Sequence, residues 1–137
     1  MTFQLSQKRR RIDLSFSATL GHVDQAADIT KVFLIKAGLE KLAFGILLGL
    51  REALNNAVVK GCGLNRRKKV VYHLEHRPDR LILKIEDEGR GFDWRQHLGK
   101  EPSPAVASGR GLPIFEQYFE TVRFNEQGNR LILIKMI

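Results

Sequence analysis

A long apolar stripe on one predicted helix constrains the fold of this chain most. Residues 40–60 repeat apolar side chains at spacings of three and four, the period of an α-helix with one buried face. A helix of this kind must pack on a sheet or on other helices, so the chain needs a second layer. Within it, Gly45 and Gly49 form a GxxxG pattern that predicts close helix packing. The stripe consists of Leu47, Leu50, Leu54 and Val58.

The rest of the chain predicts strands, a second helix and one long loop. Alternating polar and apolar residues predict a strand at 11–18, and helical spacing follows at 22–37. Strands beginning at Lys69 and Arg80 are joined by a turn, and a loop at about 92–108 leads to a short helix and a last hairpin. The order predicts one domain over residues 1–137. We expect an α/β (α+β) two-layer sandwich, with a mixed, mostly antiparallel sheet covered on one face by helices.

Composition narrows the functional classes. The chain is 43% hydrophobic and 28% charged, which is typical of a globular protein. Its longest apolar run, residues 44–50, is far shorter than the roughly 20 residues of a membrane span, and no secretory signal is visible. We therefore expect no membrane association. A lone cysteine, Cys62, fits a reducing cytoplasm.

The net charge of +8 leaves several interpretations open. A basic surface suits nucleic acid, an acidic protein partner or nucleotide phosphates, and it also fits a merely solvated surface. No aromatic residues interleave with the basic runs at 8–11 and 66–69, and no helix-turn-helix pattern occurs, so the sequence argues against nucleic-acid binding. The histidines and the cysteine are too scattered for a zinc site.

Three short motifs carry the candidate chemistry, and the first lies on the long helix. Glu52 and Asn56 are four residues apart, so their side chains are neighbours on roughly the opposite side from the stripe. The amide oxygen of Asn56 suits Mg²⁺, and the carboxylate of Glu52 could deprotonate a nucleophile that attacks a γ-phosphate. The alternative is the polar side of an ordinary amphipathic helix, which Gly61 and Gly63 end.

The second motif, "IEDEGRGFD", places Asp87 at the end of an apolar strand and before Gly89 and Gly91. The glycines let the backbone approach a flat ligand. The carboxylate of Asp87 can accept a hydrogen bond from the exocyclic amine of adenine. The alternative is a β-turn with an exposed aspartate.

The third motif, "SGRGLPIF", places Gly109 and Gly111 before the short helix. Backbone amides at a helix N-terminus bind anions, and Arg110 could add charge at a phosphate. The alternative is a glycine entry to a helix. Neither the Walker A pattern nor the dinucleotide GxGxxG pattern occurs.

With these motifs the chain resembles the ATP-binding domains shared by gyrases, heat-shock chaperones, histidine kinases and mismatch-repair proteins (GHKL). Within that group it is most similar to the small bacterial anti-sigma-factor serine/threonine kinases. "REALNNAVVKG" resembles the family's N box, and the second and third motifs resemble its two glycine boxes. The similarity covers nearly the whole chain from Arg11 onward.

The resemblance implies roles by position. Glu52 matches the general base, Asn56 the Mg²⁺ ligand and Asp87 the adenine-binding aspartate. The segment at about 92–108 matches the ATP lid, where Arg95 and Lys100 could approach phosphates. Lys60 stands where relatives often carry histidine. The remaining residues implied to line the ATP pocket are Lys60, Gly89, Gly91, Gly109, Arg110, Gly111 and Leu112.

These observations give one main hypothesis and two alternatives. The main hypothesis is a cytoplasmic regulatory serine/threonine kinase that binds Mg-ATP, phosphorylates an antagonist protein of anti-anti-sigma type and sequesters a sigma factor. Relatives often dimerise, so a homodimer is a further expectation. The first alternative is a non-catalytic ATP-binding module that clamps a regulatory partner. The second is a detached histidine-kinase catalytic domain.

Overall fold

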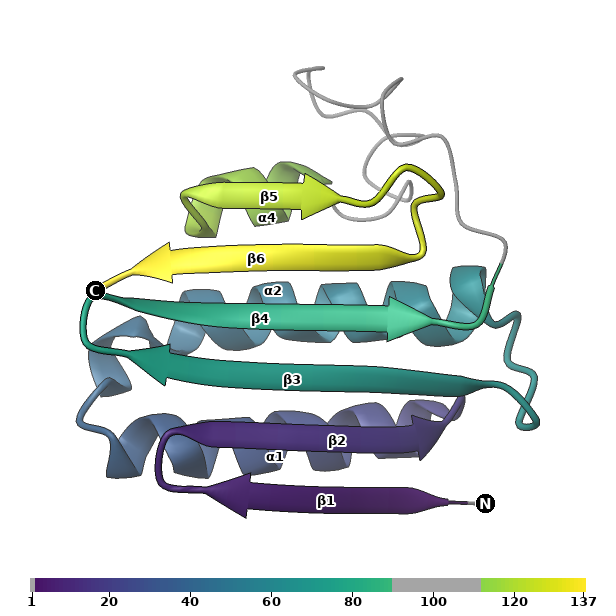
Figure 1. The fold of residues 1–137 in the computed structure, drawn as a ribbon, viewed down its shortest axis with the longest axis horizontal. Helices are drawn as coiled ribbons and strands as arrows, with labels where there is room; N and C mark the ends of the chain where they lie inside the picture. Colours follow the sequence, from purple (N-terminus) through teal and green to yellow (C-terminus); the bar gives the residue numbers. More distant parts are fainter. Residues whose placement is uncertain (1, 90–111) are drawn as a thin grey trace.

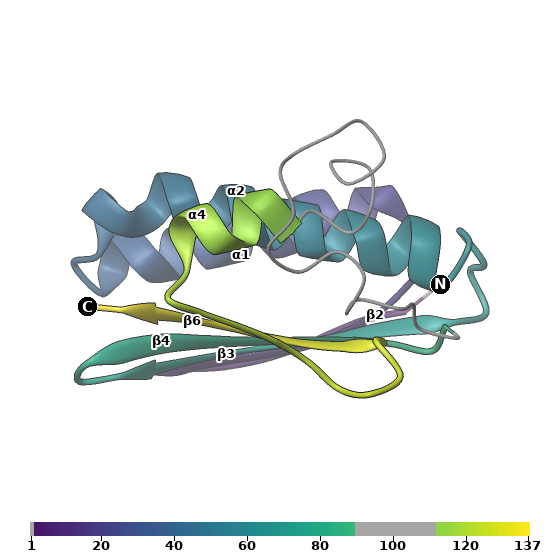
Figure 2. The same cartoon turned by 90° about the horizontal axis from the view of Figure 1, so that it is seen from above.

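A computed structural model describes residues 2–89 and 112–137 of the chain (Figure 1). The fold has two layers, a six-stranded sheet and a layer of helices on one of its faces (Figure 2). The strands lie in the order β1-β2-β3-β4-β6-β5. Their bounds are β1 Phe3–Lys8, β2 Arg11–Ser17, β3 Lys69–Arg77, β4 Arg80–Asp87, β5 Thr121–Phe124 and β6 Arg130–Met136. The helices are α1 Leu20–Lys36, η1 Glu40–Leu42, α2 Ala43–Asn56, η2 Ala57–Gly61 and α4 Leu112–Tyr118.

The predicted two-layer sandwich is confirmed, and its sheet is antiparallel in every strand pair that the structure describes. Two helices, α1 and α2, join β2 to β3 and run in opposite directions, so the chain re-enters the sheet antiparallel to the strand it left (Figure 1). Strands β4 and β5 run the same way, but β6 lies between them and pairs antiparallel with both. The expected parallel component of a mixed sheet is therefore absent from the described strands.

Strand β1 was not predicted. It pairs with β2 along its whole length, from Phe3 opposite Phe16 to Lys8 opposite Arg11. Most of its side chains are exposed because it is an edge strand at the border of the helical layer. The alternation of Phe3 and Leu5 with polar residues was the only signal in the sequence, and it is too short to outweigh the basic residues that follow.

Helix α1 has a defined start and stop. The side-chain oxygen of Thr19 accepts a hydrogen bond from the backbone N–H of His22 at 3.4 Å, which makes Thr19 the N-cap. At the other end Gly38 has φ +74°, and the N–H groups of Gly38 and Leu39 donate to the carbonyls of Ile35 and Leu34. This is a Schellman motif, and it turns the chain towards α2.

The predicted helix over residues 40–60 is built in three parts. A 3₁₀ turn (η1) leads into α2, and the helix then continues as the π-helical segment η2. Leu50, Leu54 and Val58 of the predicted stripe are fully buried against the sheet, whereas Leu47 is only half-buried. Ile46, Ala53 and Ala57 widen the buried face beyond the predicted stripe.

The segment Glu40–Gly61 is long and apolar enough to cross a membrane by length and composition. Its buried side chains belong to the same core as those of the sheet, which accounts for the apolar composition. The absence of membrane association stays a prediction.

The GxxxG expectation is met by α4. A β-carbon on Gly45 would lie 2.5 Å from a ring carbon of Tyr118, and one on Gly49 would collide with the ring of Phe119. The two glycines therefore let the end of α4 lie directly on α2. This contact fixes one wall of the cavity described next.

Candidate functional site

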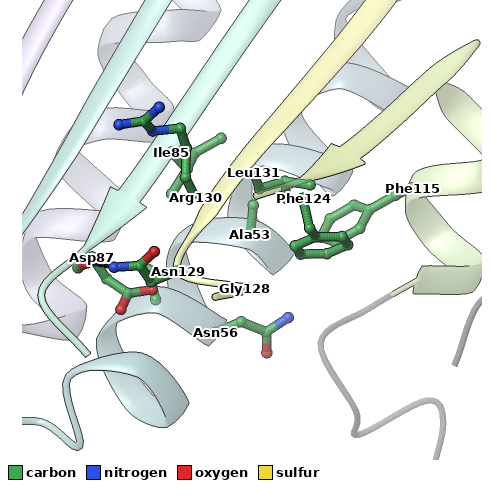
Figure 3. A pocket seen from close by; sticks show the side chains of 11 residues that line it. Ala53, Asn56, Ile85, Asp87, Phe115, Phe124, Gly128, Asn129, Arg130 and Leu131 are labelled. Atoms are coloured by element: carbon green, nitrogen blue, oxygen red, sulfur yellow. Dashed lines mark hydrogen bonds between the residues drawn. The ribbon is translucent and has the colours of Figure 1, made fainter. Parts of the chain in front are cut away.

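A small cavity of about 30 Å³ lies between α2 and the end of the sheet where β4 finishes (Figure 3). This is room for about one water molecule and is well below the roughly 300–1,000 Å³ of a typical ligand pocket. Most of its wall is apolar, and the polar groups gather on one side around Asp87 and Asn129. The lining residues are Ala53, Asn56, Ala57, Ile85, Asp87, Phe115, Phe124, Gly128, Asn129, Arg130 and Leu131.

Asp87 supplies the carboxylate among the described lining residues of this cavity. It is the last residue of β4 and is only 8% exposed. Its Oδ1 accepts a hydrogen bond from the backbone N–H of Gly89 at 2.7 Å, which fixes the carboxylate over the turn that follows the strand. The alternative of an exposed aspartate is therefore wrong, since Asp87 is buried and lines the cavity.

The π-helical segment places Gly61 directly against this carboxylate. A β-carbon on Gly61 would lie 2.5 Å from Cγ of Asp87, and one on Gly89 would collide with the carbonyl of Gly61. Three positions, 61, 87 and 89, thus meet without space for another side-chain atom. The sequence marked Gly61 only as a helix end, and its contact with Asp87 was missed because nothing local in the sequence signals a π turn.

Asn56 lines the cavity, but Glu52 does not. Both residues are half-exposed and stand off the buried stripe of α2, and Asn56 reaches the cavity beside Ala53 and Ala57. Glu52 is half-exposed, one helical turn away. The structure therefore brings Asn56 and Asp87 to one cavity and leaves Glu52 beside it.

Lys60 is exposed and is not among the lining residues. In η2 the hydrogen bonds span five residues, as in the bond from the Cys62 N–H to the Ala57 carbonyl at 2.8 Å.

The β5–β6 turn adds two asparagines that sequence reasoning missed. Oδ1 of Asn125 accepts hydrogen bonds from the N–H groups of Gly128 at 2.8 Å and Asn129 at 3.1 Å. Nδ2 of Asn129 donates to the backbone carbonyl of Asp87 at 3.3 Å, and the N–H of Asp87 donates to the carbonyl of Asn129 at 3.0 Å. The turn is thereby fixed to the end of β4. The sequence "NEQGN" predicts the β5–β6 hairpin, but it does not predict that the turn contacts the end of β4.

This arrangement of helix, buried aspartate and glycines agrees with a comparison against known families. Residues 16–135 match the model of the histidine kinase-like ATPase domain. The chain belongs to this family. A comparison with curated proteins found no match.

The kinds of side chain in the lining are compatible with the adenine of the ATP that a histidine kinase-like ATPase domain is expected to bind, although the cavity itself is smaller than a base. Apolar side chains such as Ile85 and Phe124 can contact a flat base, and Asp87 offers the acceptor that an exocyclic amine requires. Gly61 and Gly89 leave the carboxylate room only because they lack side chains.

The described residues do not form a metal site by themselves. No group of three histidine, cysteine, aspartate or glutamate side chains comes together in residues 2–89 and 112–137. Magnesium commonly uses one or two protein ligands together with substrate phosphates, and Asn56 could supply such a ligand within this ATPase domain. Nearby, burial raises the pKa of the Cys62 thiol, which keeps it protonated and unsuited to a nucleophilic role.

The remaining predicted residues of the ATPase domain are not placed. Gly91, Gly109, Arg110, Gly111 and the proposed lid at about 92–108 lie outside the described residues. Leu112 is the first residue of α4, and its side chain is not described.

Proposed function

We propose that this ATPase domain is a regulatory serine/threonine kinase of anti-sigma-factor type. In this proposal it binds Mg-ATP and transfers the γ-phosphate to an antagonist protein of anti-anti-sigma type, and it also sequesters a sigma factor in the cytoplasm. The observation that carries the nucleotide part is the cavity that Asn56 and Asp87 share, with Gly61 packed against the carboxylate of Asp87.

Each residue has a separate task in this proposal. Asp87 accepts a hydrogen bond from the base and Asn56 holds the metal ion. Bound Mg²⁺ would neutralise phosphate charge. Glu52 would accept the proton of the attacking hydroxyl, which requires that the substrate protein approach from the exposed side of α2 where Glu52 lies.

The nucleotide site is tested by titrating the chain with ATP, with and without Mg²⁺, in a calorimeter. Asp87→Asn should weaken binding at least about tenfold, because the N–H of Gly89 already donates to one oxygen and the amide N–H₂ that replaces the other cannot accept from an exocyclic amine. The control is Asp79→Asn in the exposed β3–β4 turn, where the carboxylate accepts from Arg80. Equal affinities of the Asp87 variant and the wild type would remove Asp87 from the site.

Phosphoryl transfer is tested with labelled ATP and candidate antagonist proteins. Glu52→Gln should lower transfer by about 10²-fold or more, the usual contribution of a general base, and leave ATP affinity unchanged. Asp28→Asn, an exposed carboxylate of α1, is the matched control. Full transfer by the Glu52 variant would show that another group is the base, and acid-labile phosphohistidine would favour a detached histidine-kinase domain.

One observation favours the second candidate, a non-catalytic ATP-binding module that clamps a partner. Glu52 stands outside the cavity lining, and its half-exposed side chain would suit a partner contact equally well. ATP binding without loss of the γ-phosphate, in the presence of every partner that binds the chain, would establish this function.

A further inference from the structure

A second hollow lies at the opposite end of the sheet from the cavity. We call it the basic groove, and its volume is about 470 Å³. It forms where the β1–β2 turn, the end of α1 and the end of β3 meet, whereas Asp87 lies at the other end of the strands (Figure 1). The lining residues are Gln7, Lys8, Arg9, Arg10, Phe33, Lys36, Ala37 and His76.

The cations of the basic groove have no carboxylate partner among the described residues. Lys8, Arg9, Arg10 and Lys36 are all exposed, and none forms an ion pair within residues 2–89 and 112–137. The groove lining includes no aspartate or glutamate. Elsewhere, ion pairs hold Arg11, Arg51, Arg77, Arg80, Arg130 and Lys135.

Clustered positive charges without counter-charges repel one another and attract anions. Three of the four cations, Lys8, Arg9 and Arg10, follow each other in the β1–β2 hairpin, and Lys36 approaches from α1. The hairpin tip precedes residues 16–135, the part of the chain that matches the family, whereas Lys36 lies within it. The basic groove lies at the other end of the strands from Asp87, so a ligand beside Asp87 would not use it.

We propose that the basic groove binds an acidic segment of a partner protein. The guanidinium groups of Arg9 and Arg10 can each hold a carboxylate with two hydrogen bonds, and Lys8 and Lys36 add point charges. A concave site with four cations suits several carboxylates of one extended segment.

Two other polyanions fit the basic groove less well. Duplex DNA is commonly held by about 6–10 phosphate contacts, more than four cations provide, and single strands require exposed aromatic side chains. Phe33 is only 3% exposed, and the ring of His76 packs edge-on against it with centroids 6.4 Å apart. An anionic membrane surface would require apolar anchors, and the groove lining presents no exposed apolar side chain larger than alanine.

The test measures binding of fluorescein-labelled hexaglutamate to the full chain by fluorescence anisotropy at low salt. The groove variant Lys8→Gln, Arg9→Gln, Arg10→Gln should weaken binding at least about tenfold. The matched control Arg66→Gln, Arg67→Gln, Lys69→Gln removes the same number of exposed charges at the other end of the sheet and should weaken it less than about threefold. Lys36 lies in α1 rather than in the hairpin, and Lys36→Gln alone should weaken hexaglutamate binding about threefold or more.

Several outcomes would overturn the proposal. They are no binding of hexaglutamate by the wild type, equal losses in the groove and control variants, or tighter binding to an oligonucleotide or to phosphatidylglycerol vesicles than to the peptide. If the triple variant fails to fold, Lys36→Gln decides the question, since it leaves the hairpin intact. ATP affinity of the groove variants should equal that of the wild type, which separates this proposal from the fate of the nucleotide site.

Discussion

At the scale of single residues, a buried chain of hydrogen bonds links the helical layer to the sheet through Thr30 and Tyr72. The hydroxyl of Thr30 in α1 donates to the carbonyl of Ala26 at 2.9 Å, so the Tyr72 hydroxyl from β3 must donate to Thr30 Oγ1 at 2.8 Å. Both residues are 0% exposed. Burial also raises the pKa of Tyr72, so its hydroxyl keeps its proton and remains a donor.

Removing the Thr30 hydroxyl should lower the free energy of unfolding more than removing the Tyr72 hydroxyl. Thr30→Val leaves the Tyr72 hydroxyl buried without an acceptor and should lower the free energy of unfolding by about 1–3 kcal/mol. Tyr72→Phe leaves Thr30 with its bond to Ala26 and should cost only about 0.5–1.5 kcal/mol. Urea denaturation measures both. A smaller loss for Thr30→Val than for Tyr72→Phe would contradict the assigned donor direction.

Residue identities were predictable where a motif is local and were missed where the contact is distant. Asn56 and Asp87 were expected at one site, and both line the cavity. Asn129 was missed because its relation to Asp87 arises from the pairing of β4 with β6, between residues more than 40 positions apart. No short-range pattern contains that information.

At the scale of elements, the two ends of the α2 helix make different contacts. Its first half packs on α4 through Gly45 and Gly49, and its continuation η2 unwinds into a π turn that meets Asp87. The apolar period predicted the helix and its burial correctly. The π turn was not predicted, because the same residues fit a regular α-helix by their periodicity.

The α2–α4 contact predicts whether replacing Gly49 raises or lowers the stability of the fold. Gly49→Ala improves helix propensity by up to about 1 kcal/mol, but its methyl group collides with the ring of the buried Phe119, and overpacking costs about 1–3 kcal/mol. We expect a net loss of stability in thermal unfolding. Gly21→Ala in α1 is the control, because a β-carbon there meets nothing within 4 Å, and it should be neutral or stabilising. Stabilisation by Gly49→Ala would show that α4 moves freely on α2.

At the scale of the whole molecule, the order of elements predicted the layers and most of the sheet. The neighbours of each strand were harder to predict, because β6 lies between β4 and β5 and β1 extends the edge beside β2. Both features depend on tertiary strand pairing, which local sequence patterns do not encode. The result is a long sheet with the cavity beside Asp87 at one end of its strands and the basic groove at the other (Figure 1).

The contact of Gly61 with Asp87 limits how this site can change over generations. A lineage that replaced Gly61 by any larger residue would displace the carboxylate while still encoding aspartate at position 87. Inspection of position 87 alone would then count such a descendant as functional when its pocket is already lost. Position 61 is consequently the better marker of a working copy, although it carries no chemistry of its own.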